Sequence, residues 1–382
     1  MKRRGLLLGL CLAALLPLSG CWNSKDIQNM DYATAIGLDY VDGKYITYVQ
    51  FLNFSNVGRN ETVQIGKEVP IWVGRGEGAT VSQSMSSIYA TSQMHIFWGH
   101  VKTIVCSESL LKKGVEEAYN SINRFGEIRY NIYIFGTKEK FTDLFIQKSI
   151  FNLSPLDTIM FSPEQIYAQR SFIMPLTGNQ VIAQLTEPGE PAMLPSISIV
   201  RDVWKEDKRS RPMLKIDGAY FFQGKKMQTW MAEEELAGSR WTQKQLKRSL
   251  ISVPAGDHPY ATLVLINPHY HVDARVKDGK ARFDLSLQLD ATLDDLNREV
   301  SVEELERLTE AAVREDIMDS FRKGLAKQVD VLKLEETLYR NHPKQWHLLH
   351  DKQEFLLDRD SINSITVKVH LRNTGKYKGR IR

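Results

Sequence analysis

The chain has 382 residues, of which 42% are hydrophobic and 25% are charged, an ordinary composition for a globular protein. This length predicts two or three domains. The formal net charge is +4, and removing the charges of Lys2, Arg3 and Arg4 leaves about +1 for the residues after position 20. So balanced a charge excludes the strongly basic class of nucleic-acid-binding domains, and we expect no nucleic-acid partner.

The first 21 residues have the pattern of an export signal. The basic start is followed by an apolar run from Gly5 to Leu16, and the small residues Ser19 and Gly20 stand directly before Cys21. The run is shorter than the roughly 20 apolar residues that a membrane-spanning helix needs. We therefore predict that residues 1–20 are a lipoprotein signal peptide and that Cys21 carries an S-diacylglycerol group, with its amino group open to N-acylation. The alternative is an ordinary secretory signal with a chance cysteine.

The cysteine count bears on how the mature chain is stabilised. Cys11 would leave with the signal and Cys21 would be acylated, so Cys106 would be the one free thiol and no internal disulfide would form. Cys106 ends an apolar run that contains Ile104 and Val105. We predict a buried strand residue at this position rather than a reactive thiol.

Strand and helix patterns alternate from the predicted lipidation site to about residue 200. Tyr, Ile, Val and Thr are dense in 32–41 and 44–54, and Asp42-Gly43 between them is a strong β-hairpin signal. Further strands are predicted over 69–73, within 95–106, and over 129–135 and 196–200. Helices are predicted over 79–92, 111–122 and 138–147, with another starting at Ser162-Pro163.

A glycine-rich segment, Gly74-Arg75-Gly76-Glu77-Gly78, lies between a predicted strand and a predicted helix. Such a turn can present backbone N–H groups to a phosphate. The spacing is G-x-G-x-G rather than G-x-G-x-x-G, and no Lys-Ser/Thr pair follows as a P-loop requires. We therefore predict a flexible strand-to-helix turn here, not a phosphate site.

Residues 201–212 (RDVWKEDKRSRP) are charged, poor in aliphatic side chains and end at a proline, so we predict a linker there. It would separate an N-terminal α+β region over 21–200 from a C-terminal α+β domain over 213–382. The N-terminal region leaves open a division into two subdomains, with a break near 150–195.

The C-terminal domain also combines strands and helices. Strands are predicted over 214–222, 227–231, 261–276, 281–291 and 364–371. Ser301-x-x-Glu304 is a capping box that opens the longest helix, and a helical stretch over 331–349 is interrupted at Pro343. The whole pattern predicts a multi-domain α+β fold of mostly antiparallel sheets with helices packed on them.

Motifs for catalysis are largely absent from the sequence. It contains no G-x-S-x-G, H-E-x-x-H, EF-hand loop or C-x-x-C. His269 and His271 would share one strand face and could chelate a metal, but His258 nearby brings no cysteine or carboxylate cluster, which favours an exposed strand face. The carboxylates of 233–235 are explained by a neighbouring helix start. We expect no catalytic, cofactor-binding or metal-binding residues, and no enzyme.

Several short segments resemble, in order, the C-subunit lipoproteins of spore germination receptors, the GerAC family. The shared residues are Gly20-Cys21-Trp22-Asn23, Asp26-Ile27, Ala35-Ile36-Gly37-Leu38-Asp39, Gly99-His100-Val101-Lys102, Leu111-x-x-Gly114-Val115, Arg129, Gly218-Ala219-Tyr220-Phe221-Phe222, Met227, Glu234-Glu235 and Pro343-x-x-Trp346. This similarity spans nearly the whole chain, which makes it more specific than any one motif.

The resemblance implies a non-catalytic lipoprotein on the outer face of the inner membrane of bacterial endospores. It would act with two polytopic membrane subunits, A and B, as a nutrient germinant receptor, and would be an elongated molecule of several α+β domains. The alternative is a stand-alone surface lipoprotein that binds a small solute for a transporter. The residues themselves favour this less, because they show no doubly wound α/β pattern.

Overall fold

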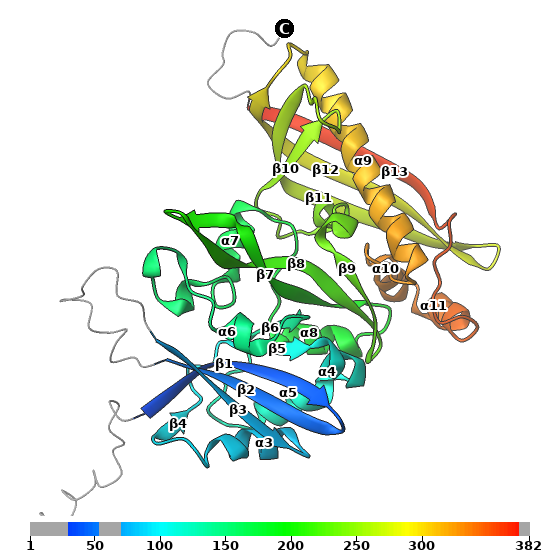
Figure 1. The fold of residues 1–382 in the computed structure, drawn as a ribbon. Helices are drawn as coiled ribbons and strands as arrows, with labels where there is room; N and C mark the ends of the chain where they lie inside the picture. The colour runs from blue at the N-terminus through cyan, green and yellow to red at the C-terminus, as the bar shows by residue number, and fades with distance from the viewer. Residues whose placement is uncertain (1–29, 53–69, 374–382) are drawn as a thin grey trace, which may run out of the picture.

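The computed structural model describes residues 30–52 and 70–373 (Figure 1). The predicted signal peptide and Cys21 lie outside these residues. No helix among the described residues has the length and apolar character needed to cross a bilayer.

A nine-stranded sheet forms the N-terminal part of the molecule. Its order is β3-β2-β1-β5-β6-β7-β8-β9, and β4 pairs with β1 outside this path. The strands are β1 (Met30–Val41), β2 (Lys44–Leu52), β3 (Ile71–Gly78), β4 (His95–Phe97), β5 (Thr103–Ser107), β6 (Tyr133–Thr137), β7 (Ala192–Glu206), β8 (Arg209–Gln223) and β9 (Lys226–Ala232). Parallel pairs join β1, β5, β6 and β7 in the middle, and antiparallel hairpins form both edges.

Helices cover both faces of this sheet because successive strand residues point to opposite sides. On β5, Ile104 and Cys106 face a core shared with α3, α4, α5 and α8, whereas Val105 faces a second core with α6. The helices are α3 (Val81–Ile88), α4 (Glu108–Lys113), α5 (Val115–Asn123), α6 (Phe141–Phe145), α7 (Pro163–Gln169) and α8 (Gly178–Thr186). Cys106 is a buried strand residue, as predicted, and burial raises the pKa of its thiol to about 12.

The C-terminal part is a four-stranded sheet with the order β10-β11-β12-β13. Its elements are β10 (Ser249–Val253), β11 (Ala261–Lys277), β12 (Lys280–Leu296), α9 (Val302–Ala326), α10 (Leu334–Asn341), α11 (Pro343–His350) and β13 (Ile362–Asn373). The long helix α9 crosses one face of this sheet (Figure 1). The Ser301 side chain accepts a hydrogen bond from the backbone N–H of Glu304, which confirms the predicted start of α9.

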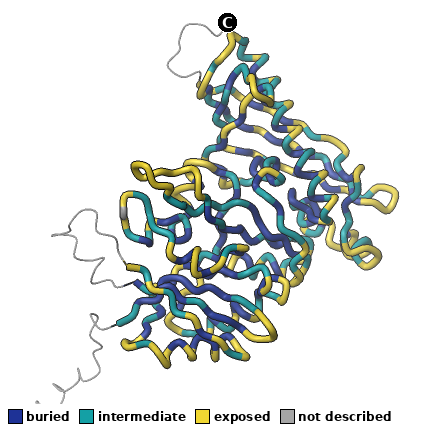
Figure 2. The backbone as a smooth tube through the Cα atoms, viewed as in Figure 1, coloured by how far each residue is buried: buried dark blue, intermediate teal, exposed yellow. Residues whose placement is uncertain are grey.

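A third hydrophobic cluster joins the two sheets, and buried segments run through the middle of the molecule (Figure 2). Phe221 of β8 and Met231 of β9 pack in the same cluster as Leu263 of β11 and Ile317 of α9. Trp241 of η6 (Ser239–Thr242) is fully buried in this cluster. The predicted α+β fold is therefore confirmed, with its two sheets joined by apolar packing.

Two local predictions are wrong. Residues 201–212 form no linker, because they are the distal end of the β7–β8 hairpin, with Trp204 opposite Arg211 and Glu206 opposite Arg209. The segment 74–78 is not a turn either, because it lies within β3 and pairs with β2. A Cβ on Gly76 would lie 1.9 Å from the Ser84 carbonyl oxygen, so this glycine lets α3 pack directly on the strand.

Candidate functional site

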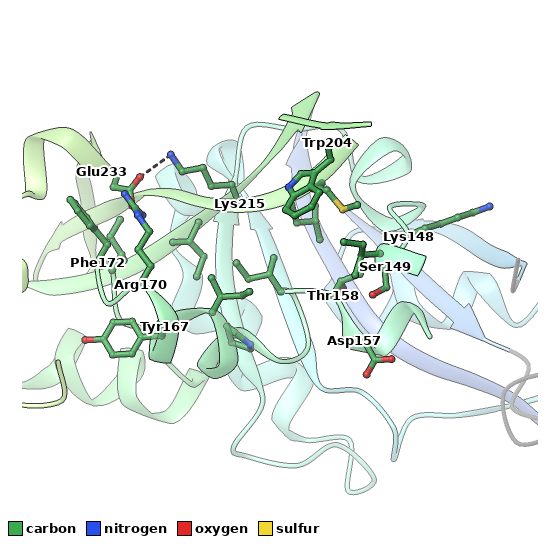
Figure 3. A pocket seen from close by; sticks show the side chains of 18 residues that line it. Lys148, Ser149, Asp157, Thr158, Tyr167, Arg170, Phe172, Trp204, Lys215 and Glu233 are labelled. Carbon is green, nitrogen blue, oxygen red and sulfur yellow. Dashed lines mark hydrogen bonds and ion pairs between the residues drawn. The ribbon is translucent and has the colours of Figure 1, made fainter. Parts of the chain in front are cut away.

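A cavity of about 400 Å³ lies beside the β7–β8 hairpin, between β8 and the segment around α7 (Figure 3). Its walls combine aliphatic and aromatic side chains with a few charged ones. The aliphatic lining includes Ile159, Ile173 and Ile216, and Trp204 projects over it from the hairpin. These residues come from three separate parts of the sequence, which only the folded sheet brings together.

Glu233 is the buried charge of this cavity. Its residue is only 3% exposed and stands directly after β9, in η5 (Glu233–Leu236). One carboxylate oxygen pairs with the Arg170 guanidinium, and the other lies 2.8 Å from the Lys215 ammonium (Figure 3). A buried carboxylate is costly unless cations or donors compensate it, and these two cations do so here.

Arg170 and a second arginine, Arg240, stack on the aromatic ring of Phe172. The guanidinium carbons of Arg170 and Arg240 lie 4.5 Å and 4.3 Å from the centroid of Phe172. Burial lowers the pKa of Arg240 to about 10, although Asp316 at 3.2 Å opposes this shift. Asp316 also accepts a 3.0 Å hydrogen bond from the Trp241 indole. The stack therefore connects the cavity to the shared core.

The mouth of the cavity is apolar and accessible. Ile166 of α7 and Trp204 are both exposed large hydrophobic residues. Inside, both carboxylate oxygens of Glu233 are engaged by cations, which suits a structural anchor rather than a general base. The arrangement can hold an apolar side chain or a small solute against its walls, with any anionic end toward Arg170 and Lys215.

A second cavity, of about 290 Å³, lies between the N-terminal and C-terminal parts. It contains Asp330 and Glu335, both nearly fully buried. Burial, and then the nearby Asp330 carboxylate, raise the pKa of Glu335 to about 8. Burial also raises the pKa of Asp330 to about 6. The hydrogen bonds that Asp330 accepts from the backbone N–H groups of Glu335 and Leu332 act in the opposite direction and lower this pKa. The buried indole Nε1 of Trp346 borders the same space and has no partner among the described residues.

The structure locates most of the residues that sequence reasoning singled out. His269 and His271 lie on exposed positions of β11, where Nδ1 of His269 contacts the Asn267 carbonyl at 3.0 Å and Nε2 of His271 contacts Asp273 at 3.2 Å. Within the described ranges, no group of three His, Cys, Asp or Glu residues is arranged to hold a metal. Cys21 lies outside the described residues.

Neither cavity was predicted from the sequence. The interpretation of 233–235 as helix-start carboxylates fits Glu235, whose side chain accepts from the Ala232 N–H at 2.9 Å. It misses Glu233, which points into the first cavity instead.

The two sheets with their helices define an α+β protein. Residues 23–199 match the family described as Spore germination protein N-terminal domain, and residues 217–375 match Spore germination B3/GerAC like, C-terminal. The two matches follow each other in chain order and leave only the ends and residues 200–216 uncovered. The chain belongs to the GerAC family of spore germination proteins and is a GerAC-like C subunit.

Individual relatives agree with this assignment. Spore germination protein KC of Bacillus subtilis (strain 168) is 19% identical, covering 98% of this chain and 97% of the relative. Spore germination protein A3 of the same organism is 23% identical, covering 77% of this chain and 74% of the relative. The crystal structure of the GerBC protein has the same fold, with a TM-score of 0.51 and 15% identity, covering 91% of this chain and 100% of that one.

Proposed function

We propose that this protein is the lipid-anchored, non-catalytic subunit of a nutrient germinant receptor on the outer face of the spore inner membrane. The observation that carries the proposal is the match of both family regions, in order, over 23–375, directly after the Gly20-Cys21 motif. The partners would be the polytopic A and B subunits of the receptor.

The lipid on Cys21 would act by confining the body to the membrane surface. Tethering raises the effective concentration of a protein near partners in the same membrane, to roughly the millimolar range for short linkers. Stable anchoring needs two acyl chains or a second membrane signal, and a diacylglyceryl group supplies two chains. The body would then stabilise or gate the complex through surface contacts.

The test is a mild-detergent pull-down of the lipidated protein from spore inner membranes, with mass spectrometry of the retained proteins. We expect two polytopic subunits to be retained. A Cys21→Ser variant should lose membrane retention and the germination response together. Spores that germinate normally with Cys21→Ser at wild-type protein level would contradict the anchoring role.

A second candidate function is binding of a small solute for a transporter. The cavity of about 400 Å³ favours it, because small-molecule sites commonly span about 300–1,000 Å³. The same pull-down discriminates, since a solute-binding lipoprotein would elute alone or with an unrelated transporter. Trp204 at the cavity mouth should then change its fluorescence when the solute is titrated into the purified protein.

A further inference from the structure

Large apolar side chains gather at the end of the N-terminal sheet where β1 begins. Trp72 is the second residue of β3 and is 72% exposed, and Met94 directly precedes β4 and is also exposed. Strand register places both beside the start of β1, because Tyr32 pairs with Leu52, Leu52 with Ile71, and Met30 with His95. This end of the sheet therefore presents apolar surface to solvent.

Two more exposed apolar residues follow α6, which covers the opposite face of the sheet from α3. The Thr34 hydroxyl donates to Gln50 Oε1 at 2.7 Å, and Gln50 Nε2 donates to the Phe145 carbonyl at 2.6 Å. These bonds hold the end of α6 close to Thr34 of β1. Thr34 follows Met30 by four residues, or about 13 Å along the strand. Ile146 comes next in the chain and Phe151 soon after, and both are exposed. We call Trp72, Met94, Ile146 and Phe151 the anchor-side patch.

Phe151 is the most prominent member of this patch. It lies in η3 (Ile150–Asn152) with φ of 57° and ψ of 26°, a left-handed conformation that bulky residues rarely adopt. Its side chain is 83% exposed, so packing in the core does not explain this conformation. Strained backbone that holds an apolar side chain out into solvent is typical of a binding surface.

The number of residues between Cys21 and β1 limits how far this end of the sheet can lie from the bilayer. Cys21 precedes Met30 by nine residues, and nine residues span at most about 32 Å when fully extended. A lipid on Cys21 would therefore keep the bilayer surface within that distance of Met30, at the start of β1. The start of β1, where this segment joins the body, lies on the left of Figure 1, as do α7 and the tip of the β7–β8 hairpin.

We propose that the anchor-side patch is a second membrane contact, which rests on the interfacial region of the bilayer and orients the body relative to it. The inference rests on the proposed lipid anchor at Cys21 and adds a defined orientation to it. Trp and other aromatic side chains favour the headgroup level of a membrane, and exposed apolar patches of this kind favour burial there. The four residues come from both faces of the sheet near its β1 end, so this end of the sheet, rather than one face, would rest on the bilayer.

The test uses the acylated protein reconstituted in vesicles of phosphatidylglycerol and phosphatidylethanolamine. A Phe151→Cys variant is labelled with an environment-sensitive fluorophore, since Cys106 is buried and does not compete for the label. The matched control is Leu348→Cys on α11, which is 65% exposed but lies in the C-terminal part. We expect the label at position 151, and not at 348, to shift to the blue and to be quenched by nitroxide lipids.

The outcomes separate this proposal from the one on which it rests. A protein that stays on the vesicles with a water-exposed label at 151 would overturn the membrane contact and leave the anchor intact. A label shielded only after the polytopic subunits are added would also overturn it, in favour of a protein contact. A protein that does not associate at all would overturn the anchor and, with it, the orientation.

A second measurement does not depend on the acyl chains. The unacylated Cys21→Ser protein should bind the same vesicles weakly, and its partition coefficient should fall about tenfold for each of Trp72→Ser and Phe151→Ser. Leu348→Ser should leave the coefficient unchanged. Equal binding by all these variants would show that the patch does not contact lipid.

Discussion

The two cavities each bury a carboxylate, and they compensate for its burial in opposite ways. Glu233 lies between the Arg170 and Lys215 cations. Glu335 has the Leu356 N–H at 2.9 Å and, close by, a second buried carboxylate on Asp330. The first cavity balances charge with charge, whereas the second favours a bound proton and raises the pKa of Glu335 to about 8. Similar burial therefore leads to different chemistry, because the neighbouring groups differ.

The largest expected effect is a pH dependence that belongs to the second cavity. The pKa of Glu335 rises from 4.5 to about 8 on folding, so between these values the folded chain holds a proton that the unfolded chain has lost. Stability should therefore be highest below the unfolded pKa. It should fall by up to about 1.4 kcal/mol per pH unit as the pH rises through this window, and level off above it. Urea unfolding across the window measures this slope.

The matched variant for that series is Glu335→Gln, which keeps an acceptor for the Leu356 N–H and removes the titrating group. Its stability should decline less steeply between pH about 5 and about 8 than that of the wild type. Parallel curves for the two proteins would show that Glu335 does not carry the dependence.

The next largest effect should come from removing both cations of the first cavity. The double variant Arg170→Met and Lys215→Met removes both ion pairs of the buried Glu233, which should cost about 2 kcal/mol. This figure lies below the usual range for a buried pair, because both cations are about half exposed. Chemical denaturation at neutral pH measures it, with the urea dependence of the unfolding free energy checked for constancy.

Adding Glu233→Leu to that double variant provides the control. An apolar replacement of a whole buried charge cluster is often neutral, so the triple variant should recover most of the lost stability. A triple variant as unstable as the double one would locate the loss in packing rather than in charge.

A smaller effect is expected at Phe172, whose ring contacts two guanidinium groups. Phe172→Leu keeps most of the apolar volume and removes both cation–π contacts, which should cost about 1 kcal/mol. Thermal unfolding measures this loss. The same substitution in the Arg170→Met background should cost less, and an undiminished loss would contradict the role of the cation–π contact.

The smallest effect is expected at an exposed side-chain contact. His271 and Asp273 lie 3.2 Å apart on β11 with side chains 68% and 77% exposed. Asp273→Asn should change stability by no more than about 0.5 kcal/mol, because water already solvates both groups. A larger loss would remove the contrast between buried and exposed charges on which the other predictions depend.

The sequence allowed prediction of features that depend on neighbours in the chain. The hairpin at Asp42-Gly43, the N-cap at Ser301 and the strand position of Cys106 each follow from a few adjacent residues. The prediction of a linker over residues 201–212 was wrong because a two-stranded ribbon that is exposed on both faces has the same composition as a linker. The prediction of a turn over residues 74–78 was wrong because a strand on which a helix packs closely also needs small residues such as glycine.

The first cavity lay beyond such local reasoning. Arg170, Lys215 and Glu233 stand far apart in the sequence and meet only after β8 and β9 pair and α7 folds against them. Nothing in the spacing of these residues indicates that meeting. Their charges look like ordinary surface charges until the burial of Glu233 is known.

The shared core has a mechanical consequence for the molecule. Residues 200–216, between the two family regions, belong to the β7–β8 hairpin, and Phe221 and Met231 pack in one cluster with the C-terminal sheet. Close-packed interiors resist compression and transmit strain. The two parts should therefore move as one rigid body rather than as two domains that rotate about a hinge. A displacement of α9 would then also move β1 and the point where the segment from Cys21 joins the body.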